Sequence, residues 1–256
     1  MKSFEVLNAP ASWGAIDFLS DLHLSPSTPK TLAALQRHLH DTPADAVFLL
    51  GDIFEVWIGD DARLEEGFEA ACLALLRKAA GIRPLFFMAG NRDFLLGEAM
   101  ARDAGLRLLP DPLVLQACGQ RLLLSHGDAL CLDDQAYQRF RAQVRDPVWQ
   151  AQFLTQPLEA RRTIGRQMRE ASERAKRQQS PELWADVDAD AARDWLGRAQ
   201  CQVLLHGHTH RPAVHDLGAG MSRWVLSDWD LEGAPPRGDV LRLSASGLQR
   251  LPLPAA

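Results

Sequence analysis

Short apolar runs recur along the chain, and each of them stops at a cluster of polar residues. Five runs show this: AIDFLS ends at Asp21, AVFLL at Gly51-Asp52, PLFFMA at Gly90-Asn91, RLLLS at His126-Gly127-Asp128, and CQVLL at His206-Gly207-His208. Continuous apolar runs of roughly four to eight residues are typical of strands that are buried on both faces. Helical patterns lie between them, such as Leu32, Leu35 and Leu39 at spacings of three and four. Strand and helix therefore alternate, which predicts an α/β fold.

A long stretch between residues 133 and 198 interrupts this alternation. Four segments in it are helical in composition, and three of them begin at or beside a proline, as helices often do. We expect a helical cap over residues 133–198, inserted into a single domain that spans residues 1–256. The β segments PAVHDL, SRWVLSDW and DVLRLSASGLQRLPL are expected after it, and about a dozen residues precede the first expected strand.

The polar clusters are candidates for a common site, because ligands of open α/β sheets bind beyond the carboxyl ends of the strands. Two pairs within them, Asp21 with His23 and His206 with His208, are spaced so that in an extended chain both side chains point the same way. Any one of these residues alone is more typical of a helix cap, a turn or a hydrogen-bonded core histidine. Five ordered clusters after five strands favour one shared site, formed by Asp21, His23, Asp52, Asn91, His126, His206 and His208.

The chemistry of this set indicates metal ions. Oxygen and imidazole donors without thiolate suit a first-row ion such as Mn²⁺, Fe²⁺, Co²⁺ or Zn²⁺. Seven ligands are too many for one ion, so the set predicts two ions about 3.5–4 Å apart that share one carboxylate. Such a pair of ions activates water near neutral pH and clamps a phosphoryl group during in-line attack.

Charge and composition narrow the choice of partner and location. The net charge of −5 argues against general binding of nucleic acid, but residues 139–177 contain ten Lys and Arg against four Asp and Glu. This local excess indicates an anionic partner or, alternatively, a solvated helix face. No apolar stretch reaches the roughly 18 residues of a membrane span. The N-terminus lacks the apolar centre of a signal peptide, so we expect a cytoplasmic protein with reduced cysteines.

Five motifs, SDLHL, GDIFEVWIGDD, GNRDF, SHGD and HGHTHRP, resemble those of the calcineurin-like metallophosphoesterases. This resemblance implies a sandwich of two sheets flanked by helices, with a dinuclear metal site. By motif it implies one ion held by Asp21, His23, Asp52 and His208. It implies a second ion held by Asp52, Asn91, His126 and His206, so that Asp52 is the bridge.

Within that superfamily the chain is similar to the hydrolases that act on UDP-2,3-diacylglucosamine in lipid A synthesis. The similarity lies in GNRDF, with Arg92 where most of the superfamily has His, in HGDALCLDDQAYQRFR and in the helical insertion. It implies two Mn²⁺ ions, attack of water on the α-phosphorus to give UMP and 2,3-diacylglucosamine 1-phosphate, and peripheral association with the cytoplasmic face of the inner membrane. It implies catalytic roles for Asn91, Arg92 and His206, and substrate contacts at Asn91, Arg92, Asp134, Tyr137, Ser172, Lys176, Gln179 and His206.

The residues of the insertion allow two interpretations. Its large apolar side chains line a groove for acyl chains, or they only pack the insertion onto the core; they are Tyr137, Phe140, Trp149, Phe153, Ile164, Met168 and Trp184. Arg92 suits phosphate oxygens and does not readily donate a proton, which fits a phosphate leaving group. Two other functions stay open: a broader dinuclear phosphodiesterase or nuclease, against which the net charge and Arg92 count, and a non-catalytic scaffold with this fold.

Overall fold

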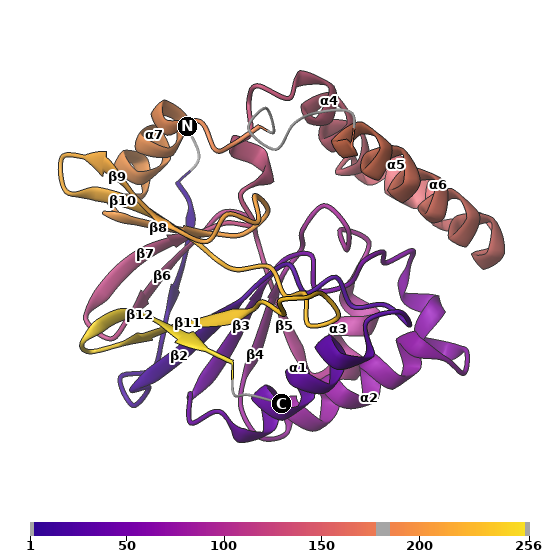
Figure 1. Cartoon of the computed structure of the whole chain (residues 1–256), viewed down its shortest axis with the longest axis horizontal. Helices are drawn as coiled ribbons and strands as arrows, with labels where there is room; N and C mark the ends of the chain where they lie inside the picture. The colour runs from indigo at the N-terminus through magenta and orange to yellow at the C-terminus, as the bar shows by residue number, and fades with distance from the viewer. Residues whose placement is uncertain (1–2, 178–184, 254–256) are drawn as a thin grey trace.

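The computed structural model describes residues 3–177 and 185–253, and it consists of two six-stranded sheets with helices on their outer faces (Figure 1). Sheet B has the strand order β12 (Gly247–Pro252), β11 (Asp239–Ser244), β2 (Ala15–Leu19), β3 (Ala46–Leu50), β4 (Leu85–Met88) and β5 (Leu106–Leu109). Strands β2 to β5 run parallel. The carboxyl ends of β2, β3 and β4 therefore lie at the same edge.

Sheet A has the strand order β1 (Glu5–Asn8), β6 (Leu113–Ala117), β7 (Gln120–Leu124), β8 (Val203–His206), β10 (Met221–Val225) and β9 (Val214–Gly218). Strands β7 and β8 are parallel neighbours, so their carboxyl ends also lie together. The five apolar runs are confirmed as β2, β3, β4, β7 and β8, and the expected late β segments contain β9 to β12. β1 lies in the N-terminal residues for which the sequence predicted no strand.

The expected sandwich is confirmed by three layers of buried apolar residues, one between the two sheets and one on the outer face of each sheet. Phe18, Phe48 and Leu50 of sheet B meet Leu122 and Leu124 of sheet A between the two sheets. The outer face of sheet B is covered by α1 (Pro29–Asp41), α2 (Phe68–Ala80) and α3 (Glu98–Ala104). Two short 3₁₀ helices, η1 (Asp60–Leu64) and η2 (Asp128–Leu130), follow β3 and β7.

Three helices of the predicted insertion project beyond the sheets, at the upper right of Figure 1. They are α4 (Gln135–Val144), α5 (Pro147–Leu154) and α6 (Leu158–Arg177), and we call them the cap helices. Asp134 and Asp146 accept the capping bonds that start α4 and α5. The fourth helix, α7 (Ala189–Ala199), differs from the expectation, because Ala192 and Leu196 bury it against sheet A. No helix in residues 3–177 and 185–253 is long and apolar enough to cross a membrane.

A charge pair with a buried carboxylate joins the neighbouring strands β2 and β11 of sheet B. Asp17 lies opposite Arg242 in the antiparallel register of β2 and β11, and two bonds of 2.6 and 2.8 Å link their side chains. Thr42 donates a further bond of 2.6 Å, and Nε2 of His38 lies 3.1 Å from the same carboxylate. Burial alone raises the pKa of Asp17, but the contacts with Arg242, His38 and Thr42 outweigh it and lower the pKa to about 2.

We predict that Asp17→Asn lowers the free energy of unfolding by about 2 kcal/mol at pH 7, because it leaves the half-buried guanidinium of Arg242 without a counter-charge. The folded pKa of Asp17 is depressed, so its stabilisation is present above the unfolded pKa near 4 and is lost as the pH falls to about 2. The difference in the free energy of unfolding between wild type and variant, measured by urea unfolding, should therefore become smaller from pH 4 to pH 2.

The matched control for this experiment is Asp194→Asn on the outside of α7. Asp194 lies 3.3 Å from Arg198, and its side chain is 63% exposed. Loss of such an exposed pair should change the free energy of unfolding by less than about 0.5 kcal/mol. If Asp17→Asn changed the free energy of unfolding as little as Asp194→Asn does, the pair of Asp17 and Arg242 would not stabilise the sheet.

Candidate metal centre

Loops from both sheets meet at one edge of the sandwich and are joined there by backbone hydrogen bonds. The amide of Asp21, after β2, donates to the carbonyl of Gly51, after β3, at 3.0 Å. The amide of Gly207, after β8, donates to the carbonyl of His126, after β7, at 3.0 Å. Trp229 donates to the carbonyl of Asp21 at 3.0 Å and so links the two sheets. The predicted polar clusters therefore lie side by side on a fixed backbone.

Two groups of potential metal ligands lie at this edge. In the first group, Asp21, His23 and His210 offer atoms that all lie within 4.8 Å of one another. Nε2 of His23 is 3.2 Å from Nε2 of His210, which is in turn 3.3 Å from Oδ1 of Asp21. Separations of roughly 3 Å are expected between donors that share an ion with bonds of about 2 Å.

The second group consists of Asp52, His126 and His208, again within 4.8 Å of one another. Nε2 of His126 lies 3.6 Å from Oδ1 of Asp52. Oδ1 of Asn91 lies 3.0 Å from the same nitrogen and 2.8 Å from Nδ1 of His208. Asn91 therefore brings a fourth potential donor atom to this group.

The last histidine cluster differs from the sequence-based assignment. His206 and His208 were expected as ligands, with His208 beside Asp21 and His23, but His208 lies beside Asp52 and His210 takes the place beside Asp21. His206 is fully buried as the final residue of β8; its Nδ1 lies 2.9 Å from the carbonyl of Gly207, and its Nε2 lies 3.4 Å from Arg223. The chain leaves the sheet only after His206, so the two histidines beyond the turn reach the edge.

The signal for this arrangement was present in the sequence, because His208 and His210 have the same spacing of two as His206 and His208. The geometric reason given for that spacing is wrong, however. Five ligand positions have left-handed rather than extended backbone, with φ values of 55° at Asp21, 48° at His23, 53° at Asp52, 66° at His208 and 53° at His210. Such conformations cost about 1–3 kcal/mol each and cluster at functional sites.

Glycines make room for the buried carboxylates. A Cβ atom on Gly90 would lie 2.2 Å from Oδ1 of Asp52, and a Cβ atom on Gly207 would lie 2.3 Å from Oδ2 of Asp21. Both distances are far below a van der Waals contact. These two positions therefore need glycine because a carboxylate occupies the space of the missing side chain.

Asp93 has a structural part in the site that the sequence did not reveal. Its buried carboxylate accepts bonds from the amides of Gly90 at 2.7 Å and Ile53 at 2.8 Å, and lies 3.3 Å from the amide of Asp52. Burial and the neighbouring Asp52 raise the pKa of Asp93 to about 6. Asp93 thus ties the loop after β3 to the loop after β4, and so sets the distance between Asp52 and Asn91.

The electrostatics of the edge suit cations. Burial raises the pKa of Asp21, but His210, His126 and His23 outweigh it and hold that pKa well below its usual range. Burial lowers the pKa of His126, and the carboxylates of Asp52, Asp21 and Asp128 reverse this and raise it to about 9. In the absence of another cation, the buried carboxylates thus favour the protonated, positively charged form of His126.

Two further features fit a metal ion. Oδ1 of Asp21 is buried, and its ion-pair contact in the part of the chain that the structure describes is Nε2 of His210 at 3.3 Å, which is itself a potential ligand. Burial, together with His126, lowers the pKa of His208 to about 3, which keeps its imidazole neutral. Neutral imidazole and ionised carboxylate are the forms that bind metals. His208 already has the neutral form, and a bound ion would take the place of the proton that the carboxylates favour on His126. The donor types of both groups therefore fit the ions predicted from the sequence.

A cavity of 620 Å³ opens beside the second group and extends beneath the cap helices. Asn91 and Arg92 lie at its core side, and Asp134 and Tyr137 lie at its α4 side. The rest of its lining is mostly apolar: Val56, Trp57, Ile58, Phe94, Leu95, Ala136, Phe140, Trp149, Phe153, Gly165, Met168 and Arg169. An apolar chamber therefore joins a cluster of charged and metal-ligating groups.

The expected substrate contacts divide into three sets. Asn91, Arg92, Asp134 and Tyr137 line the cavity, whereas buried His206 does not. The side chains of Ser172 and Lys176 and all of Gln179 lie outside the described residues, as does Trp184. Trp149 and Phe153 line the cavity and also pack on the core of sheet B, where Ile164 joins them. Packing onto the core is thus observed for these three residues, and the groove for acyl chains stays a prediction.

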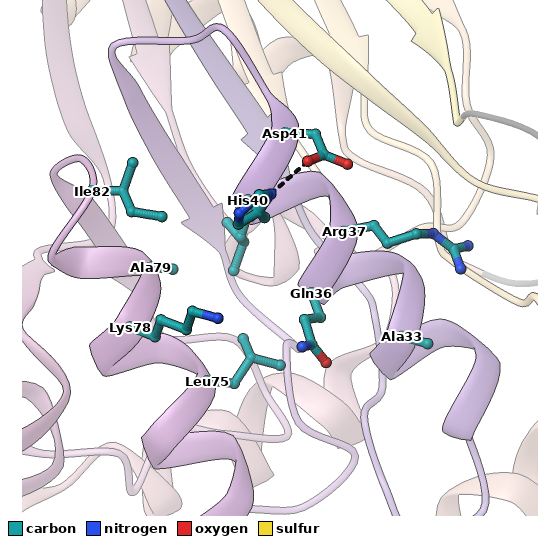
Figure 2. Close-up of a pocket in the computed structure, with 10 residues that line it drawn as sticks. Ala33, Gln36, Arg37, His40, Asp41, Leu75, Lys78, Ala79 and Ile82 are labelled. Carbon is teal, nitrogen blue, oxygen red and sulfur yellow. Dashed lines mark hydrogen bonds and ion pairs between the residues drawn. The ribbon is translucent and has the colours of Figure 1, made fainter.

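A second hollow lies away from the potential metal ligands. A groove of 360 Å³ lies between α1 and α2, with Leu75, Ala79 and Ile82 at its side (Figure 2). The one histidine in its lining, His40, contacts the neighbouring Asp41 at 2.6 Å, and both side chains are largely exposed. No residue of the two ligand groups lines this groove.

Comparison with known proteins agrees with this geometry. The family model of the calcineurin-like phosphoesterases matches residues 14–212. The chain is 47% identical over 245 residues to a UDP-2,3-diacylglucosamine hydrolase of Chromobacterium violaceum, which covers 93% of this chain and 99% of that protein. Proteins of the same name from Bordetella pertussis (46% identity, 95% and 96% covered) and Stenotrophomonas maltophilia (44%, 90% and 95%) are similar over the same extent. The chain therefore belongs to the calcineurin-like phosphoesterase family.

Proposed function

We propose that the protein hydrolyses UDP-2,3-diacylglucosamine to UMP and 2,3-diacylglucosamine 1-phosphate in lipid A biosynthesis. The observation that carries this proposal is that Asn91 and Arg92 border both the ligand groups and the apolar cavity. A substrate with a diphosphate next to two acyl chains is divided into a charged and an apolar part in the same way as this site. The relatives that cover nearly the whole chain have this substrate in their names.

We assign the histidine ligands of two Mn²⁺ ions from the distances, and we keep Asp52 as the bridge because the motif resemblance implies it. Asp21, His23, Asp52 and His210 would hold one ion, and Asp52, Asn91, His126 and His208 the other, with Asp52 as the bridge. Oxygen and imidazole donors without thiolate support manganese over softer ions. When bound, two such ions polarise a phosphoryl group and make water more acidic.

The protein's own residues position the diphosphate and its leaving group. The amide of Arg92 donates to Oδ1 of Asp52 at 2.8 Å, which fixes the loop from which the guanidinium lines the cavity. A guanidinium matches phosphate oxygens, and it stays charged. In the reaction, the oxygen of water bonds to the α-phosphorus, and the bond to the bridging oxygen breaks. That oxygen leaves with its electron pair as the sugar 1-phosphate, and the proton of the water passes to solvent.

The cap helices supply the apolar part of the site. All three cap helices line the cavity, through Phe140 of α4, Trp149 and Phe153 of α5, and Met168 of α6. Burial of acyl chain contributes about 0.8 kcal/mol per CH₂ group, so a chain in this chamber would be held strongly. Arg92 at one end and these apolar residues at the other would then fix the scissile bond beside Asp52.

We also propose that the protein works in the cytoplasm, bound peripherally to the inner membrane. Support comes from the surface of the cap helices, where Val148 and Leu154 are 64% and 41% exposed. Arg139 and Arg166 are exposed on the same helices. Basic residues near an anionic membrane contribute about 1 kcal/mol each, and exposed apolar residues add to this attachment.

The direct test is release of UMP from UDP-2,3-diacylglucosamine by the metal-stripped protein after addition of Mn²⁺. We expect UMP in proportion to enzyme, and little turnover of p-nitrophenyl phosphate, which has neither a diphosphate nor acyl chains. Cleavage of DNA or bis-p-nitrophenyl phosphate at a comparable rate would instead indicate a broad phosphodiesterase. A protein that bound no metal and released no UMP would be a scaffold.

A second prediction separates the two histidine assignments. His210→Gln and Asp52→Asn should each weaken ion binding and lower kcat/KM on the order of a thousandfold, because each removes a proposed ligand whose ion is worth several kcal/mol in the transition state. His206→Gln should keep both ions, since the ring of His206 contacts Gly207 and Arg223 instead. Metal content after dialysis and UMP release are the measurements. Loss of an ion in His206→Gln with full retention in His210→Gln would restore the order predicted from the motif.

A further inference from the structure

One face of α6 contacts the segment 55–61, which follows β3, at three successive turns of the helix. Arg161 donates to the carbonyl of Ile58 at 2.6 Å and also pairs with Asp61. One turn later, a Cβ atom on Gly165 would lie 2.9 Å from Val56. After another turn, Nε of Arg169 lies 2.9 Å from Oε1 of Glu55. Residues four apart share a helix face, so these contacts form a single docking stripe.

Glu55 stands at the end of this stripe and faces the ligand groups with its other oxygen. Oε2 of Glu55 lies 3.1 Å from Nδ1 of His23, while Oε1 contacts Arg169. The opposite ring nitrogen of His23, Nε2, points at His210 and the first ligand group. An unbroken series of contacts thus runs from the cap helices through Arg169, Glu55 and His23 to the proposed metal centre.

Two of the other ligand histidines, His210 and His126, are held from within the two sheets and their loops. Nδ1 of His210 lies 3.5 Å from Asp228, whose carboxylate is fixed by Arg237 at 2.6 Å. Nδ1 of His126 lies 3.0 Å from the carbonyl of Leu50, the last residue of β3. A carboxylate or carbonyl behind a metal-ligating histidine orients the ring and raises its basicity. Of these three histidines, His23 is the one whose partner also contacts a cap helix.

We propose that Glu55 is a positioning residue that makes ion binding at Asp21, His23 and His210 depend on the seating of α6. This inference rests on the proposed function, since it takes these three residues as metal ligands. Coupling of this kind is reciprocal. An ion in the first group therefore favours the seated helix, and a diacylated sugar nucleotide in the cavity that α6 borders favours the ion.

The test is titration of the metal-stripped protein with Mn²⁺ alone, by calorimetry or chelator competition. Glu55→Ala removes the carboxylate that faces Nδ1 of His23 and should weaken the binding of one of two ions by about 10–100-fold, as loss of such partners does. Arg169→Gln leaves that carboxylate in place but removes its contact with α6, so we expect the affinity for the same ion to fall by about threefold. Glu55→Gln breaks the same ion pair, so its loss of Mn²⁺ affinity should equal that of Arg169→Gln. The double variant Glu55→Gln with Arg169→Gln should bind Mn²⁺ no more weakly than either single variant.

Arg162→Gln is the matched control. Arg162 joins α6 to Glu65 at 2.9 Å, outside the series that leads to His23, so its loss should leave both affinities within the error of the titration. The proposal is overturned if Glu55→Ala leaves both ions bound as in wild type. It is also overturned if Arg162→Gln weakens an ion as much as Arg169→Gln, because seating of α6 would then act without Glu55. A wild-type protein that bound no Mn²⁺ would instead overturn the proposed metal centre itself.

Discussion

Burial of carboxylates at the edge shared by two sheets is the constraint on which the rest of this structure depends. Asp21 is fully buried and Asp52 is 2% exposed. Removing each such charge from water costs several kcal/mol unless opposite charges lie close to it. This cost is offset by the surrounding histidines, by the glycines that allow close approach, and by the amides that Asp93 fixes. The fold is therefore organised to hold cations as much as to hold a core.

The two sheets contribute unequal parts to that edge. Sheet B supplies the carboxylates through the loops after β2 and β3, whereas sheet A supplies His126, His208 and His210 through the loops after β7 and β8. Each ligand group thus combines oxygen from one sheet with imidazole from the other. The apolar layer between the sheets keeps the two halves in register, so packing far from the edge determines the distances within it.

The sequence predicted the buried strands that end at the site but not β1, for a physical reason. β2, β3 and β4 are buried on both faces and therefore read as continuous apolar runs, but β1 is an edge strand with three of its four residues exposed. The kinds of ligand were likewise predictable, since strand ends with Asp, Asn and His suffice for that. The pairing of histidines was not, because His206, His208 and His210 have equal spacing and only the point where β8 ends separates them.

The left-handed backbone at the ligand positions limits how such a centre can be moved between proteins. Asp21, His23, Asp52, His208 and His210 each need a positive φ directly after a strand. Valine, isoleucine and threonine are excluded there by their branched Cβ. Grafting the side chains onto a scaffold with ordinary turns would reproduce the donor atoms but not their directions. A transplanted centre of this type would have to bring its strand-to-loop turns along with its ligands.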